Sequence, residues 1–128
     1  MTGRRRGDKG AAVVDFVLVM LLLVPLVLGI LQLALVLHVR NTLASAAGEG
    51  ARFAAVAGSS PELGEAKARE QVRAALGPRF ARGIDVAPAS VGGAAGYRAR
   101  IVADVPVLGI AGRLVTVTVT GHAVAEQQ

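Results

Sequence analysis

The chain divides into three stretches according to the spacing of its hydrophobic residues. Residues 16 to 37, FVLVMLLLVPLVLGILQLALVL, form an apolar run of 22 positions without a charged side chain. At about 1.5 Å per residue, a helix of this length covers about 33 Å, enough to cross a hydrocarbon core of about 30 Å. The sequence therefore predicts a single transmembrane helix, which we place at residues 11–40.

Beyond this run, small apolar residues recur at spacings of three and four. This spacing puts them on one face of a helix, so the same helix is expected to continue over residues 41–57. Its small side chains at positions 46, 50 and 54 permit the close approach of another helix or a sheet. The predicted face consists of Leu43, Ala46, Ala47, Gly50, Ala54 and Ala57.

A second helix is expected over residues 59–77. Ser59 or Ser60 can cap its first turn, and Pro61 suits the first helical position. The Gly77-Pro78 pair is a stop signal. Its predicted apolar stripe is thin and consists of Leu63, Ala66, Val72 and Leu76.

Within residues 82–125 the hydrophobic period shifts to two, which predicts half-buried strands. We expect a short strand at residues 84–86 and longer ones at 97–105 and 113–125. The glycine- and proline-containing stretches 88–96 and 106–112 are the expected connections. The predicted fold class is α+β, with the long N-terminal helix packed on a small antiparallel sheet in a domain of residues 41–128.

Charge sets the expected orientation in the membrane. Residues 1–10 hold four basic side chains and one acid, a net +3, so they form a basic leader in front of the apolar run. Basic flanks stay on the cytoplasmic side, which places the N-terminus in the cytoplasm and the C-terminal domain outside it. The alternative is a secretory signal cleaved near Ala44-Ser45-Ala46, but the apolar run far exceeds the roughly 7–15 residues of such signals.

Composition narrows the classes of function. The chain has no cysteine, which excludes disulfides, thiolate metal sites and a cysteine nucleophile. Aromatic residues make up only 3%, and no basic stripe carries stacking aromatics, so a nucleic-acid partner is not expected. His38 and His122 are far apart in sequence, and no metal-ligand spacing or phosphate loop is present. We expect no enzyme activity and no cofactor.

Two residues in or beside the apolar run need an explanation. Asp15 puts a carboxylate at the edge of a membrane segment, where an unpaired charge is costly. Pro25 lies inside the run and has no N–H to donate to the carbonyl of Leu21, so a kink is expected there.

The order of a basic tail, Gly10, four small or apolar residues, Asp15 and Phe16 resembles a type IV prepilin-type leader. More narrowly, residues 9 to 57 resemble the TadE family, minor pilin-like proteins of the Tad (tight adherence) system. This family commonly has the motif R-x-x-L-x-x-A-A-x-E-G-A-R-x-A after a leucine-rich span, and its leader acid is usually Glu. The matching residues here are Arg40, Leu43, Ala46, Ala47, Glu49, Gly50, Ala51, Arg52 and Ala54.

The resemblance implies roles for particular residues. A prepilin peptidase would cut between Gly10 and Ala11, which makes Asp15 the fifth residue of the mature chain. Asp15 and Phe16 would then serve assembly, with the carboxylate able to neutralise the new amine of Ala11 on its own chain or a neighbour.

The resemblance also implies a pilin-like fold and a function. The protein would be a minor pilin or a pilus-assembly accessory subunit of a Tad-type pilus, held in the cytoplasmic membrane. Its partners would be the prepilin peptidase, other pilin-like subunits, the inner-membrane Tad assembly platform and membrane lipid. Whether it enters the filament stays open. The alternative is an unprocessed single-pass membrane-anchored binding or secretion-accessory domain.

Overall fold

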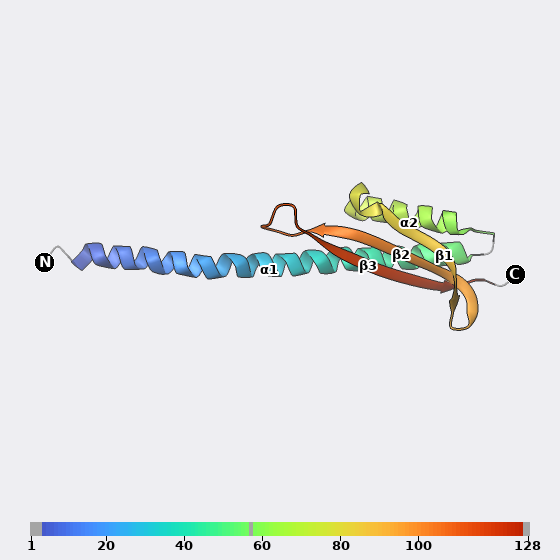
Figure 1. Ribbon diagram of the computed structural model, residues 1–128, viewed down its shortest axis with the longest axis horizontal. Helices are drawn as coiled ribbons and strands as arrows, with labels where there is room; N and C mark the ends of the chain where they lie inside the picture. Colours follow the sequence, from blue (N-terminus) through green and yellow to red (C-terminus); the bar gives the residue numbers. More distant parts are fainter. Residues whose placement is uncertain (1–3, 57, 127–128) are drawn as a thin grey trace.

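The computed structural model describes residues 4–56 and 58–126. Its dominant element is the helix α1 (Arg4–Ala55), which runs for 52 residues without interruption. At about 1.5 Å per residue, α1 is about 78 Å long. Figure 1 shows that its N-terminal half projects away from the rest of the chain, whereas its second half lies alongside the other elements.

The remaining elements form a small domain around the second half of α1. They are α2 (Pro61–Leu76), the short 3₁₀ helix η1 (Pro78–Ala81), β1 (Gly83–Val91), β2 (Ala94–Pro106) and β3 (Leu114–Val124). The strands form one sheet in the order β1-β2-β3, and both neighbouring pairs are antiparallel. This arrangement confirms the predicted α+β fold, a long N-terminal helix packed on a small antiparallel sheet.

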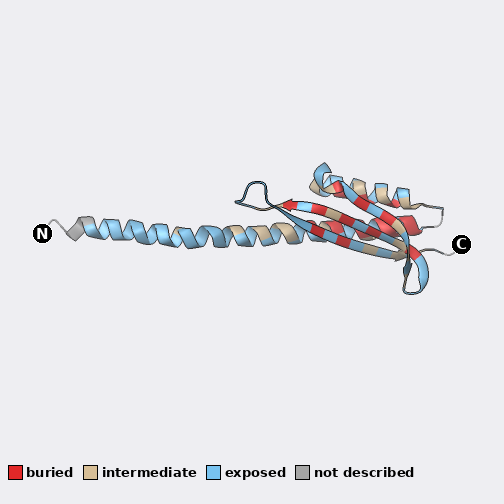
Figure 2. Cartoon of the chain, in the orientation of Figure 1, coloured by how far each residue is buried: buried red, intermediate tan, exposed pale blue. Residues whose placement is uncertain are grey.

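The core lies between one face of the sheet and the two helices. Ile101 in the central strand pairs in register with Ile84 on β1 and Val119 on β3, and all three are buried. The second half of α1 contacts β2 and β3, and α2 contacts β1. Figure 2 shows buried residues in this half of α1 and at alternate positions along the strands, and α2 adds Gly64, Ala68 and Val72. Every second strand residue therefore faces the helices, as the period of two predicted.

Glycine allows α1 and α2 to approach each other closely. A Cβ on Gly50 would lie 2.9 Å from the carbonyl oxygen of Gly64, and one on Gly64 would lie 2.5 Å from the carbonyl oxygen of Gly50. A Cβ on Gly121 of β3 would lie 2.6 Å from the backbone nitrogen of Gly48. Gly50 and Ala54, two of the small residues predicted to permit close packing, thus do so against α2, whereas β3 approaches α1 at Ala47 and Gly48.

The prediction for α2 was right about its cap and partly wrong about its packing face. Ser60 caps the helix, since its Oγ accepts a hydrogen bond from the N–H of Leu63 at 3.3 Å. Val72 is buried as expected, but Leu63 and Ala66 are exposed, and Gly64 and Ala68 lie in the contact instead. Because the two backbones almost touch, only the smallest side chains fit between them. Ala57, expected on the face of the first helix, lies outside the described residues.

The prediction for the first hairpin was wrong in its boundaries. Residues 88–96 were expected to be a connection, yet β1 continues to Val91 and β2 begins at Ala94. Only Gly92 and Gly93 form the turn, and both have a positive φ, as the two-residue hairpin turns that fit the twist of a sheet require. Pro88 is tolerated within β1 because β1 is an edge strand with one side free of ladder hydrogen bonds.

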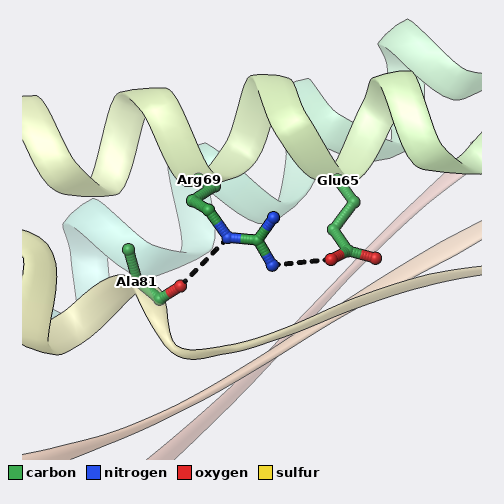
Figure 3. A network of polar contacts seen from close by, with 3 residues as sticks. All are labelled: Glu65, Arg69 and Ala81. Atoms are coloured by element: carbon green, nitrogen blue, oxygen red, sulfur yellow. Dashed lines mark hydrogen bonds and ion pairs between the residues drawn. The ribbon is translucent and has the colours of Figure 1, made fainter.

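A polar link joins α2 to η1 (Figure 3). The Nη2 of Arg69 donates to Oε1 of Glu65 at 2.6 Å, one turn earlier on the same helix. Its Nε donates to the carbonyl oxygen of Ala81 at 3.4 Å. Arg69 thus holds the end of η1, where the chain enters β1.

Candidate functional site

The N-terminal half of α1 has almost no partner within the chain. Its large apolar side chains point outward, with Leu22 77% exposed and Phe16 62% exposed. The helix is long and apolar enough to cross a membrane, and none of its most apolar 18-residue window is buried. Figure 2 shows this half as an almost continuous exposed surface. We call residues 7–38 of α1 the free half and residues 39–55 the packed half.

The predicted processing and assembly residues lie close together at the start of the free half. Gly10, Ala11, Asp15 and Phe16 are all exposed and all helical. Asp15 follows Ala11 by four residues, which places it one turn further along the same face. Helical side chains tilt toward the N-terminus, so the Asp15 carboxylate leans toward Ala11.

The helix around Gly10 is intrinsically weak. Gly7 and Gly10 each lower helix propensity by about 1 kcal/mol relative to Ala, and neither has other atoms within 4 Å of an added Cβ. The first four N–H groups of a helix also have no intrahelical acceptor. The two glycines therefore make this stretch of α1 easier to unwind than the leucine-rich run that follows it.

Pro25 and Gln32 lie where the free half meets the domain. The helix continues through Pro25 without interruption. Pro25, Leu28, Gly29 and Gln32 form one wall of a hollow of about 290 Å³ whose other wall is residues 107–110, between β2 and β3. No role was expected for Gln32, although it is the single polar side chain in the run of residues 16–37.

Gln32 joins the free half to this connection through both ends of its amide. Its Nε2 donates to the carbonyl oxygen of Pro106 at 3.3 Å, and its Oε1 accepts from the N–H of Leu108 at 2.7 Å. One side chain thus satisfies two backbone groups that lie more than 70 positions away in the sequence.

The motif residues of the packed half fall into two groups. Gly50 is buried at the contact with α2, whereas Arg40, Glu49 and Arg52 are exposed. The carboxylate of Glu49 lies 3.7 Å from the guanidinium of Arg52, with side chains 50% and 75% exposed, so this pair adds little stability. Small motif positions build the domain, and charged ones face outward.

Metal binding was also considered for the part of the chain that the structure describes. Among residues 4–56 and 58–126, no group of three or more His, Asp or Glu side chains lies close enough together to hold a metal ion.

Comparison with known proteins gives one family match, and it lies within α1. The family model of TadE-like proteins matches the chain over residues 10–52. The chain is TadE-like over this segment, which confirms the resemblance expected from its motifs. No curated protein and no solved structure gave a match.

The TadE-like segment coincides with one structural element. It begins at Gly10, near the start of the free half, and ends at Arg52, near the end of α1. Neither α2 nor the sheet lies within it. The family match therefore lies within the long helix of this chain and includes most of its exposed apolar half and of its small-residue half.

Proposed function

We propose that this protein is a minor pilin or a pilus-assembly accessory subunit of a Tad-type pilus, cut after Gly10 by a prepilin peptidase. The observation that carries the proposal is that the TadE-like segment begins at Gly10 and spans an apolar helix half whose large side chains are mostly exposed. The protein acts by helix packing and not by catalysis. Its partners are the peptidase, other pilin-like subunits and the inner-membrane assembly platform.

The free half supplies the surface for this role. Each Å² of apolar surface exposed to water costs about 25 cal/mol, so side chains such as Leu22 and Phe16 require a cover. Before assembly, lipid of the cytoplasmic membrane covers them, with the N-terminus in the cytoplasm. During assembly, the apolar half-helices of neighbouring subunits replace the lipid.

Processing changes the charges at the start of the helix. Removing residues 1–10 takes away a net +3 and creates an α-amine on Ala11. Asp15 lies four residues further on, and an ion pair with that amine, on the same chain or a neighbour, costs far less in the membrane than either charge alone. The cut thus places a new cation one helical turn from Asp15.

Intact mass of the protein from a host with a prepilin peptidase tests the processing step. We expect the loss of residues 1–10, and we expect Gly10→Leu to retain them because the side chain blocks the approach to the backbone. Gly7→Leu is the matched control, since Gly7 is also exposed and helical but lies away from the cut. Wild-type protein that keeps its leader would instead support an unprocessed membrane-anchored binding or secretion-accessory domain.

Substitution of Asp15 tests the assembly step separately. Asp15→Ala should still be cut, yet crosslink poorly to other pilin-like subunits, whereas Asp15→Glu should keep both properties. Asp8→Ala is the control, because its carboxylate leaves with the leader. If Asp15→Ala crosslinks as well as the wild type, the ion pair between Asp15 and the Ala11 amine is not needed for assembly.

A further inference from the structure

The connection between β2 and β3 turns back along the free half of α1. We call residues 107–113 the β2–β3 loop. Figure 1 shows it as the part of the domain that reaches furthest toward the N-terminal end of α1. Its contact with α1 is close, because a Cβ on Gly109 would lie 3.3 Å from Cδ1 of Leu28. The loop therefore reaches a position well inside the predicted transmembrane run.

The depth of this contact follows from the helix rise. With Phe16 at the inner boundary, a hydrocarbon core of about 30 Å ends about 20 residues later, near residue 36. Gln32 then lies about 6 Å inside the outer boundary, and Leu28 about 12 Å inside. A loop that contacts both residues cannot lie wholly outside the membrane while α1 spans it.

The side chains of the loop suit such a position. No charged residue occurs between Asp104 and Arg113. Leu108 and Ile110 are 37% and 55% exposed, although a loop tip in water usually carries polar residues. Exposed apolar residues grouped beside an exposed apolar helix form one continuous surface of the same chemistry.

Part of the loop backbone is also paired within the protein. The N–H of Val107 donates to the carbonyl of Arg113 at 3.0 Å, and the N–H of Arg113 donates to the carbonyl of Ile110 at 3.4 Å. Gln32 satisfies the carbonyl of Pro106 and the N–H of Leu108. Backbone groups in a bilayer must find partners within the protein, and these six have them.

We propose that the β2–β3 loop is a second membrane contact, with Leu108 and Ile110 among the lipid acyl chains of the outer leaflet. Arg113 closes the loop at the headgroup level, where a long cationic side chain extends toward phosphate. The loop and α1 together fix the height and rotation of the domain against the membrane before assembly. The proposal rests on the membrane position of α1 in the proposed function.

The absence of native cysteine makes the test direct. The full chain carries one cysteine labelled with an environment-sensitive fluorophore and is reconstituted into phosphatidylcholine vesicles. Ile110→Cys and Leu108→Cys report on the loop, Leu22→Cys reports on the span, and Ser90→Cys reports on the far end of the sheet. Quenching by nitroxide groups on the acyl chains is compared with quenching by aqueous iodide at two protein densities.

We expect acyl-chain nitroxide to quench both loop labels and the Leu22 label several-fold more than the Ser90 label, with iodide giving the opposite order. Iodide quenching of both loop labels as strong as at Ser90, with Leu22 still in lipid, overturns the loop contact and leaves the anchor intact. Absence of lipid quenching at Leu22 overturns the anchor and the loop contact together. Protection of the loop labels from both quenchers that grows with protein density indicates a second copy on the loop, and it too overturns the proposal.

Discussion

The two halves of α1 use hydrophobic residues in opposite ways. The free half carries large side chains such as Leu22 and Phe16, and they are mostly exposed. The packed half carries Ala47, Gly50 and Ala51, and these are buried. Most of the large apolar residues of α1 thus lie outside the core, with Val39 and Leu43 as buried exceptions, and many of its small ones lie inside it. The free half is therefore built mainly from large side chains that the domain does not bury, and the packed half mainly from small ones that it does.

The difference has a physical basis in how each cover is obtained. Lipid and neighbouring helices can adapt to protruding side chains, so the free half gains from large apolar area. A domain this small has little core volume, and close contact of backbones compensates for it. Gly50 and Gly64 bring α1 and α2 together, and Gly121 brings β3 onto α1.

Truncation of one buried and one exposed residue should give the largest contrast between the halves. Ile101 is fully buried in the central strand, so Ile101→Ala leaves a cavity and should lower the free energy of unfolding of the domain by about 2–5 kcal/mol. Leu22→Ala removes a similar volume from the free half and should leave it unchanged. Urea unfolding of the full chain in detergent micelles, followed by pulse proteolysis, measures both. Equal losses would show that the halves fold as one unit.

Glycine substitutions test the next largest effect, the close contact that only the packed half makes. In Gly64→Ala the new Cβ meets the backbone of α1, and we expect a loss of about 1–3 kcal/mol in the same unfolding measurement. Gly48→Ala is the control: its Cβ meets nothing within 4 Å, and the better helix propensity should add up to about 1 kcal/mol. If both Gly64→Ala and Gly48→Ala raised the free energy of unfolding, α1 and α2 would be able to move apart without loss of stability.

The sequence predicted well those features that depend on local periodicity. The apolar run, the three- and four-residue spacing after Arg40 and the cap at Ser60 each act within a few turns, and the structure has the corresponding elements. The motifs around Gly10 and Glu49 likewise pointed to the family that matches over residues 10–52.

Features set by tertiary contact were missed. Leu63 was expected on the packing face from the spacing of apolar residues, but that face is centred on Gly64, where the two backbones meet, and Leu63 is exposed. Pro88 suggested a connection, yet its edge position in the sheet makes a strand tolerable. The contact of Gln32 with the β2–β3 loop joins residues whose sequence separation leaves no periodic pattern.

A smaller effect is expected from the polar link that supports the packed half from outside. Arg69→Ala removes the hydrogen bonds to Glu65 and to the carbonyl of Ala81. Both charged side chains are more than a quarter exposed, so solvent screens the pair, and we expect a loss of about 1 kcal/mol or less. Lys67→Ala, an exposed neighbour on the same helix, is the control. If Arg69→Ala lowered the free energy of unfolding as much as Ile101→Ala does, the link would matter as much as a buried core side chain, contrary to this expectation.

The smallest expected effect is a pH dependence confined to the domain. The backbone N–H of Glu62 and the hydroxyl of Ser60 both donate to the Glu62 carboxylate, and they hold its pKa below the usual value. A carboxyl whose pKa is lowered by folding stabilises the domain above its unfolded pKa of about 4.3, and this contribution disappears as the pH falls through the folded pKa. Glu62→Gln should therefore lower the Tm slightly at pH 7, and the difference from wild type should shrink by pH 3. In a Ser60→Ala background the pH-dependent part should be smaller, because one donor is gone. If the Tm difference between Glu62→Gln and the wild type is the same at pH 7 and pH 3, the substitution acts through packing and not through charge.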